Sequence, residues 1–224
     1  MTSKNFQLAD YSRIRENITE LHQKALKLQT RNDILTCGRH LGLLHKKELY
    51  FNNEYEFTVL ADYRVYSYRP NGINLAELYL RLNRSVLDES QIDLLTRMSV
   101  ARYSFLHVDA VEGPGVLQVT DIFSEKSFTL VDNGLSQSLK PKQAIAAHFI
   151  DMGDFHIQSG GVLSIDRQLV STMEVEHALF VAVSKFGKKL THFTPVASAK
   201  LARATISAAI RLGYTDSCQS IAVA

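Results

Sequence analysis

Four side chains in the middle of the chain have the types and the spacing of a metal site. They are His107, His148, Asp154 and His156. Imidazole nitrogens and carboxylate oxygens bind zinc, which activates a water for hydrolysis, and neighbouring strands can bring such side chains within ligand distance of one another. A metal-dependent hydrolase is therefore one hypothesis for this segment. The alternative, which we favour, is that Asp154 is a turn residue and that the histidines occupy half-exposed strand positions.

Other signatures of catalysis are incomplete. Cys37 precedes His40 by three residues in a predicted helix, but a catalytic thiol also needs a group that orients the histidine. A single Glu-x-x-His step, from Glu174 to His177, is half of a di-iron ligand set. The sequence has no Gly-x-Ser-x-Gly elbow and no phosphate-binding glycine loop that opens a helix. We therefore predict no cofactor and favour a protein that is not an enzyme.

The two ends of the chain are basic and its centre is acidic. The formal net charge is only +2, so composition alone indicates no polyanionic partner. Nucleic acid needs clustered cations, whereas residues 103–165 hold seven acidic residues against three lysines. Nucleic acid would therefore bind the basic terminal segments, and the alternative is an ordinary solvated helix face. The candidate contacts are Lys185, Lys188, Lys189, Lys200, Arg203 and Arg211.

An aromatic and basic cluster precedes a Pro-Asn-Gly turn. It consists of Tyr63, Tyr66 and Tyr68 with Arg64 and Arg69. Such side chains can stack on bases or line a peptide groove. The alternative, which we favour, is core packing with the tyrosine hydroxyls reaching the surface.

Helical periodicity frames both ends of the chain. Residues 8–28 carry an apolar stripe at steps of three and four, which predicts an amphipathic helix. A second helix is expected over residues 32–46, capped by Asn32 or Asp33. Residues 54–68 fit a strand or a helix, and we favour the helix. The period returns over residues 174–185.

Capping residues predict where three further helices begin. Asn74 can cap a short helix, and Asp88 with Gln91 three residues later resembles a capping box. The last helix is framed by Thr194 as its cap, a proline at its first position and Gly213 past its end.

From Tyr103 to Ile165, apolar and polar residues alternate in short runs separated by turn residues about every ten positions. Five or six short antiparallel strands that must protect their edges predict a small barrel or curled sheet. The run QAIAAHFI fits a helical turn equally well. The predicted fold class is α+β, in one compact unit. Its parts are an N-terminal helical segment over 1–102, a small antiparallel β-barrel over 103–165 and C-terminal helices over 166–224.

The runs TDIFSEKSF and SLKPKQAIAAHFI, with the preceding VLADYRVYSYRPNGIN, carry a family resemblance. Over residues 54–165 the sequence resembles a group of uncharacterised bacterial proteins, some of which carry a C-terminal SEC-C zinc motif. The resemblance implies a helical lead-in to a small β-barrel and no established activity. The cysteine-rich motif is absent here, so no zinc-dependent role is implied.

Compartment and partner can be predicted only in outline. Cys37 and Cys218 stand far apart with no Cys-x-x-Cys pair, which favours a reducing compartment over a disulfide. The first residues lack a signal-peptide pattern, and no stretch approaches the roughly 18 apolar residues of a spanning helix. We expect a soluble, cytoplasmic protein with no membrane contact. The leading hypothesis is a protein-interaction module with an unknown protein partner, and a homodimer is a further alternative.

Overall fold

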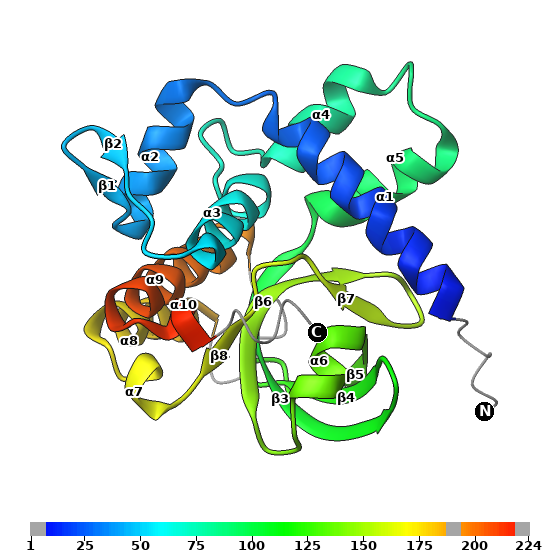
Figure 1. Cartoon of the computed structure of the whole chain (residues 1–224), viewed down its shortest axis with the longest axis vertical. Coiled ribbons are helices and arrows are strands. Elements are labelled where there is room, and N and C mark those ends of the chain that lie inside the picture. The colour runs from blue at the N-terminus through cyan, green and yellow to red at the C-terminus, as the bar shows by residue number, and fades with distance from the viewer. Residues whose placement is uncertain (1–7, 187–193, 218–224) are drawn as a thin grey trace.

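The computed structural model describes residues 8–186 and 194–217 and has an α+β fold. Figure 1 shows a small β-barrel at the lower centre, the first five helices above it and the C-terminal helices beside it. The helices are α1 Leu8–Leu26, α2 Arg31–Leu41, α3 Glu54–Tyr66, α4 Leu75–Asn83, α5 Glu89–Ser99, α6 Asn133–Ser138, α7 Arg167–Val170, α8 Met173–Phe186, α9 Pro195–Leu212 and α10 Tyr214–Ser217.

The predicted helix caps explain where several of these helices begin. Asn74 accepts a hydrogen bond from the backbone of Glu77 at the start of α4, and Asp88 and Gln91 form both bonds of a capping box at the start of α5. Thr194 caps α9, and Gly213 ends it in the left-handed conformation. Residues 54–66 form α3, so the choice of a helix there is confirmed.

The second helix differs from its prediction at both ends. Thr30 is its cap, and Asp33 completes a capping box with Thr30. The helix ends at Leu41 because Gly42 adopts the left-handed conformation. A two-stranded hairpin follows, formed by β1 Leu44–His45 and β2 Glu48–Leu49, where helix had been expected to about residue 46.

Five strands close the barrel, in the order β3, β4, β5, β7 and β6, with β6 pairing back to β3 and the short strand β8 added to β6. The predicted barrel is therefore confirmed, and QAIAAHFI belongs to a strand. The strands are β3 Arg102–Gly113, β4 Val116–Asp121, β5 Ser127–Val131, β6 Ala144–Asp151, β7 His156–Gln158 and β8 Leu163–Ile165.

Two details of the barrel correct the sequence prediction. The pairing of β5 with β7 is parallel, through Leu130 and His156, so the barrel is not wholly antiparallel. Asp132, Asn133 and Gly134 are among the turn residues that separate the predicted strands, but the segment forms α6 because the Asp132 carboxylate accepts a hydrogen bond from the backbone of Leu135 and caps a helical turn.

Three hydrophobic clusters hold these parts together. One fills the barrel, one joins α1, α3, α4 and α5, and one joins α2, α3 and α9 to β3, β6 and β8. Ser198 of α9 also accepts a hydrogen bond from the backbone of Tyr103 in β3 at 2.6 Å. As a result α3 is covered by α1 on one side and by α2 and α9 on another. Ser67, at the end of α3, contacts His148 of the barrel strand β6.

Candidate functional site

The structure does not bring the four candidate metal ligands together. His107 is bonded to Asp109 through Nδ1 at 2.9 Å on the exposed face of β3, and Asp154 is exposed in the turn before β7. His156 faces Asp151 at 3.9 Å. Within residues 8–186 and 194–217, no group of three or more histidine, cysteine, aspartate and glutamate side chains is placed to hold a metal ion.

His148 instead belongs to a buried hydrogen-bonded chain with a serine and an aspartate. Its Nδ1 lies 2.5 Å from Oδ2 of Asp62, and its Nε2 lies 2.6 Å from Oγ of Ser67. All three residues are less than 5% exposed. Asp62 belongs to α3, Ser67 caps the C-terminal end of the same helix, and His148 lies in β6. We call these three residues the Ser67 network.

The partners of the imidazole determine its tautomer. An ionised carboxylate only accepts hydrogen bonds, so Nδ1 of His148 carries the proton that Asp62 accepts. In the neutral ring Nε2 is then an acceptor, and the hydroxyl of Ser67 donates to it. The order of donors and acceptors is that of a serine, histidine and aspartate triad.

Neighbouring rings and backbone hold the Ser67 network in place. The imidazole of His148 packs against the rings of Tyr66 and Tyr103, with centroids 5.2 Å and 5.0 Å away. Gly161 lies against Asp62 so closely that a β-carbon at this glycine would be 3.1 Å from Cβ of the aspartate. Oδ1 of Asp62 is buried without a hydrogen-bond partner among the described residues. The contact between Oδ2 and His148 is therefore the main polar interaction of the Asp62 carboxylate.

Ser67 also lines a cavity of about 320 Å³ at the surface, between the end of α3, α2 and the start of α9. We call it the α3–α9 pocket. Its other lining residues are His40, Tyr63, Tyr68, Arg69, Pro70, Val196, Ala199, Lys200 and Arg203. The pocket therefore has aromatic walls, one lysine, two arginines, one histidine and no carboxylate among its described lining residues.

The electrostatics of the α3–α9 pocket favour negative charge. Within the described part of the chain, Lys200, Arg203 and Arg69 form no ion pair. Burial lowers the pKa of His40, and the nearby Arg203 lowers it further, so its imidazole is neutral at pH 7. Arg69 donates from one amino group to the carbonyl oxygen of Ser99 at 3.3 Å, and its Nε is buried with no hydrogen-bond partner among the described residues. Lys200 and Arg203 are the cations whose charge is available to a bound anion.

An acid lies beside the α3–α9 pocket. Asp33 accepts a hydrogen bond from the hydroxyl of Tyr68 at 3.0 Å, and this carboxylate lines the neighbouring cavity. Burial and this hydrogen bond raise the pKa of Tyr68 to about 12, so the ring carries a neutral hydroxyl at any physiological pH.

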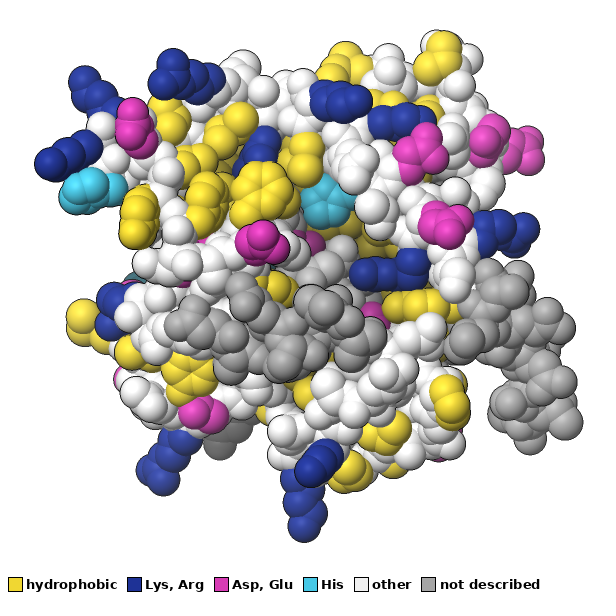
Figure 2. Space-filling view, viewed as in Figure 1, with side chains coloured by type: hydrophobic (Ala, Val, Ile, Leu, Met, Phe, Trp, Pro, Cys, Tyr) yellow, Lys and Arg dark blue, Asp and Glu magenta, His cyan; other side chains and the backbone are white. Residues whose placement is uncertain are grey.

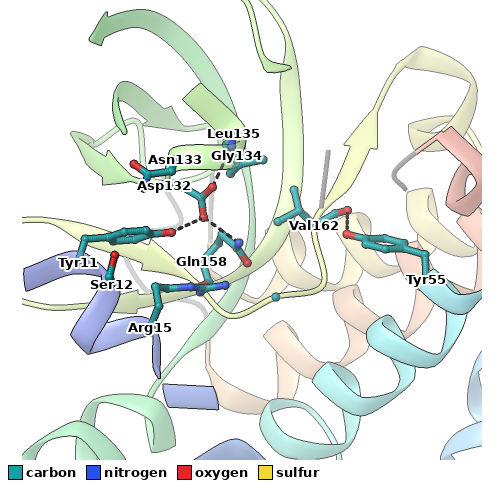
Figure 3. A pocket seen from close by; sticks show the side chains of 11 residues that line it. Tyr11, Ser12, Arg15, Tyr55, Asp132, Asn133, Gly134, Leu135, Gln158 and Val162 are labelled. Atoms are coloured by element: carbon teal, nitrogen blue, oxygen red, sulfur yellow. Dashed lines mark hydrogen bonds between the residues drawn. The ribbon is translucent and has the colours of Figure 1, made fainter. Parts of the chain in front are cut away.

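A second cavity, of about 400 Å³, lies where α1 meets the barrel. Figure 3 shows Asp132 at its centre, with Tyr11 and Arg15 of α1 on one side. Oδ2 of Asp132 accepts hydrogen bonds from the hydroxyl of Tyr11 at 3.0 Å and from Nε2 of Gln158 at 2.9 Å. Because its Oδ1 caps α6, both carboxylate oxygens are already used, and the cluster serves to join α1 to the barrel.

The basic residues singled out in the sequence have different surroundings. Lys200 and Arg203 line the α3–α9 pocket. Arg211 of the same helix donates two hydrogen bonds to the carboxylate of Glu174 in α8, at 3.0 and 3.1 Å. Lys188 and Lys189 lie outside the described residues, as does the side chain of Lys185.

Sequence reasoning identified the parts of this site without their assembly. The tyrosine and arginine cluster before Pro70 and the cations of α9 were separate candidates, and the pocket combines Tyr63, Tyr68 and Arg69 from the first with Lys200 and Arg203 from the second. Ser67 was missed. No local signal marks it, because its partner His148 is 81 residues away.

The comparisons with known proteins give a family without an activity. No curated protein and no solved structure matches the chain significantly, and the described helices include none long and apolar enough to cross a membrane. A family model matches residues 6–189. The chain belongs to this family of unknown function, DUF7986.

Proposed function

We propose that the protein binds a small organic anion with a flat ring in the α3–α9 pocket. The observation that carries this proposal is the presence of three cations, Arg69, Lys200 and Arg203, that line one cavity without any ion-pair partner among the described residues. Cations that share a pocket repel one another, and a bound anion removes that repulsion while it gains charge-assisted hydrogen bonds.

The walls of the α3–α9 pocket support the proposal that the bound anion carries a flat ring. Tyr63 of α3 and Tyr68, just past its end, line one side, and Ala199 and Val196 come from α9. Aromatic faces favour stacking with a flat ring, and the guanidinium groups suit a planar carboxylate or a phosphate. A cavity of about 320 Å³ is at the lower end of the range for small-molecule sites.

Isothermal titration calorimetry with three probes tests the proposal. Adenosine 5′-monophosphate carries a ring and a charge, adenosine carries the ring alone, and inorganic phosphate carries the charge alone. We expect saturable binding of the nucleotide and much weaker binding of both fragments. Affinity should also fall as salt is added, because the contacts are partly exposed.

Variants of α9 show whether the binding is in this pocket. Arg203→Ala should weaken nucleotide binding about 10-fold or more, since a hydrogen bond to a charged group contributes about 1.5–3 kcal/mol. Arg211→Ala is the matched control because the same helix carries it and Glu174 already pairs it. Its affinity should stay within about twofold of the wild-type value. Equal loss in both variants, or no saturable binding of any probe, overturns the proposal.

The earlier functional hypotheses have less specific support. A protein-interaction role stays a prediction, and the largest exposed hydrophobic side chains come from many separate elements. Figure 2 shows hydrophobic side chains gathered over α2 and α3 on the drawn face, with many lysines and arginines at the periphery. Nucleic-acid binding through the terminal segments also stays a prediction. Within the described part of the chain, the large hydrophobic side chains that are exposed are Tyr50, Phe57, Leu82, Val86, Val100, Ile122, Met173, Phe180 and Val196.

A further inference from the structure

We propose that Ser67 is the nucleophile of an ester hydrolase whose substrate is an anionic ester held in the α3–α9 pocket. This inference rests on the proposed anion binding and adds a reaction to it. The observation behind it is that Ser67 both lines the pocket and contacts the imidazole of His148, which in turn contacts Asp62.

The geometry meets the first requirement of a serine nucleophile. The Oγ to Nε2 distance is 2.6 Å and the Nδ1 to Oδ2 distance is 2.5 Å, both within the hydrogen-bond range expected between a nucleophile, its base and the group that orients the base. Asp62 is a positioning residue because it acts through His148. It fixes the tautomer and stabilises the imidazolium that forms when His148 accepts a proton.

Burial meets the second requirement. His148 and Asp62 are 1% exposed, and electrostatic interactions are stronger away from water. The rings of Tyr66 and Tyr103 and the close approach of Gly161 hold the pair in one arrangement. Burying the polar side chains of Asp62 and His148 costs desolvation, and well-packed apolar side chains often stabilise a fold as well or better. Ser67 connects Asp62 and His148 to a surface pocket, so a role of these buried polar side chains in catalysis accounts for their presence.

The reaction that follows is ordinary acyl transfer to water. Oγ of Ser67 bonds to the ester carbonyl carbon as Nε2 of His148 accepts its proton. The carbon–oxygen bond to the alcohol then breaks, and the alcohol leaves with that proton. Water attacks the acyl-serine with His148 again as base, and the acid is released as Ser67 recovers its proton. Arg69, two residues beyond Ser67, lines the same pocket while one of its amino groups donates to the carbonyl oxygen of Ser99, and its positive charge is the one we assign to stabilising the oxyanion.

Labelling of the wild-type protein with a fluorophosphonate, followed by peptide mass spectrometry, tests the nucleophile directly. We expect the label on Ser67. Hydrolysis of 4-nitrophenyl hemisuccinate, whose acyl group is anionic, should exceed that of 4-nitrophenyl butyrate at least about 10-fold in kcat/KM, from one charge-assisted contact.

Variants separate catalysis from folding. Ser67→Ala should lower kcat/KM at least about 100-fold, as loss of a triad member does. Ser104→Ala is the matched control, since Ser104 is also buried and hydrogen-bonded to a carboxylate, Asp121, at 2.7 Å. It should keep its activity within about threefold. Asp62→Asn should lower kcat with little change in KM, a split that a purely structural role would not give.

The outcomes distinguish this inference from the proposed function. Nucleotide binding that depends on Arg203, without a label on Ser67 and without turnover of either ester, overturns the hydrolase and leaves the binding proposal intact. A labelled Ser67 with equal turnover of the two esters supports the nucleophile and contradicts the anionic substrate. A label on another serine, or equal loss of activity in the Ser67 and Ser104 variants, overturns the assignment of Ser67.

Discussion

Gly161→Ala should destabilise the fold by pressing on Asp62. The new β-carbon would lie 3.1 Å from Cβ, 3.2 Å from Cγ and 3.3 Å from Oδ2 of the aspartate, whereas carbon atoms pack best at about 3.5–4.0 Å. Asp62 has no room to yield, because it is 1% exposed and bonded to His148 at 2.5 Å. Overpacking of this kind costs about 1–3 kcal/mol. The lower entropy of the unfolded alanine chain returns about 0.4–1 kcal/mol of this.

The expected net loss of unfolding free energy is therefore about 1.3 kcal/mol, the middle of a range from about 0 to 2.6 kcal/mol. Urea denaturation followed by circular dichroism measures it as a lower midpoint at an unchanged slope. Gly113→Ala is the matched control, since a β-carbon there meets no atom within 4 Å and the backbone is outside the left-handed region. Its unfolding free energy should rise by about 0.4–1 kcal/mol, since the entropy effect acts there without a clash. Equal midpoints for the two variants would refute the claim that Gly161 holds Asp62 in position.

Three further outcomes follow from the same contacts. Asp132→Ala should lower the unfolding free energy in urea by about 2–4 kcal/mol, because it removes the cap of α6 and leaves buried donors of α1 and β7 without an acceptor; a change below about 1 kcal/mol would contradict this. Burial lowers the pKa of His22 and His156, so the unfolded state binds more protons than the folded state below neutral pH. The unfolding free energy should therefore fall as the pH drops from 7 to 5, and it should fall less steeply in His22→Gln. Identical pH profiles of the unfolding free energy for the wild type and His22→Gln would argue against this. Arg211→Ala should change thermal unfolding only slightly, by at most about 1 kcal/mol, because its pair with Glu174 is half exposed; a loss above about 2 kcal/mol would show that the pair matters more.

Much of the helical part could be predicted because its signals are local. A cap such as Asp88 and its partner Gln91 are three residues apart, and a short stretch of sequence contains the whole interaction. The same locality explains the errors. Asp132, Asn133 and Gly134 suit a turn as well as the first turn of a helix, and only the path of the following chain makes them α6.

The barrel was predictable as an architecture but not in its strand order. Alternating runs show that strands exist, yet nothing in β5 or β7 records that these two pair in parallel. The contacts of the candidate site could not be predicted from the sequence either. Ser67 and His148 contact each other because α3 packs on β6, and a sequence spacing of 81 residues carries no trace of that contact.

Nuclear magnetic resonance of the isotope-labelled protein, titrated with adenosine 5′-monophosphate, tests the central claim most directly. The account predicts saturable shifts of backbone amides around the α3–α9 pocket, at the end of α3 and the start of α9, with few changes at the cavity beside Asp132. The same shifts should be lost in Arg203→Ala and kept in Arg211→Ala. Shifts centred on another surface, or none at millimolar nucleotide, would contradict it.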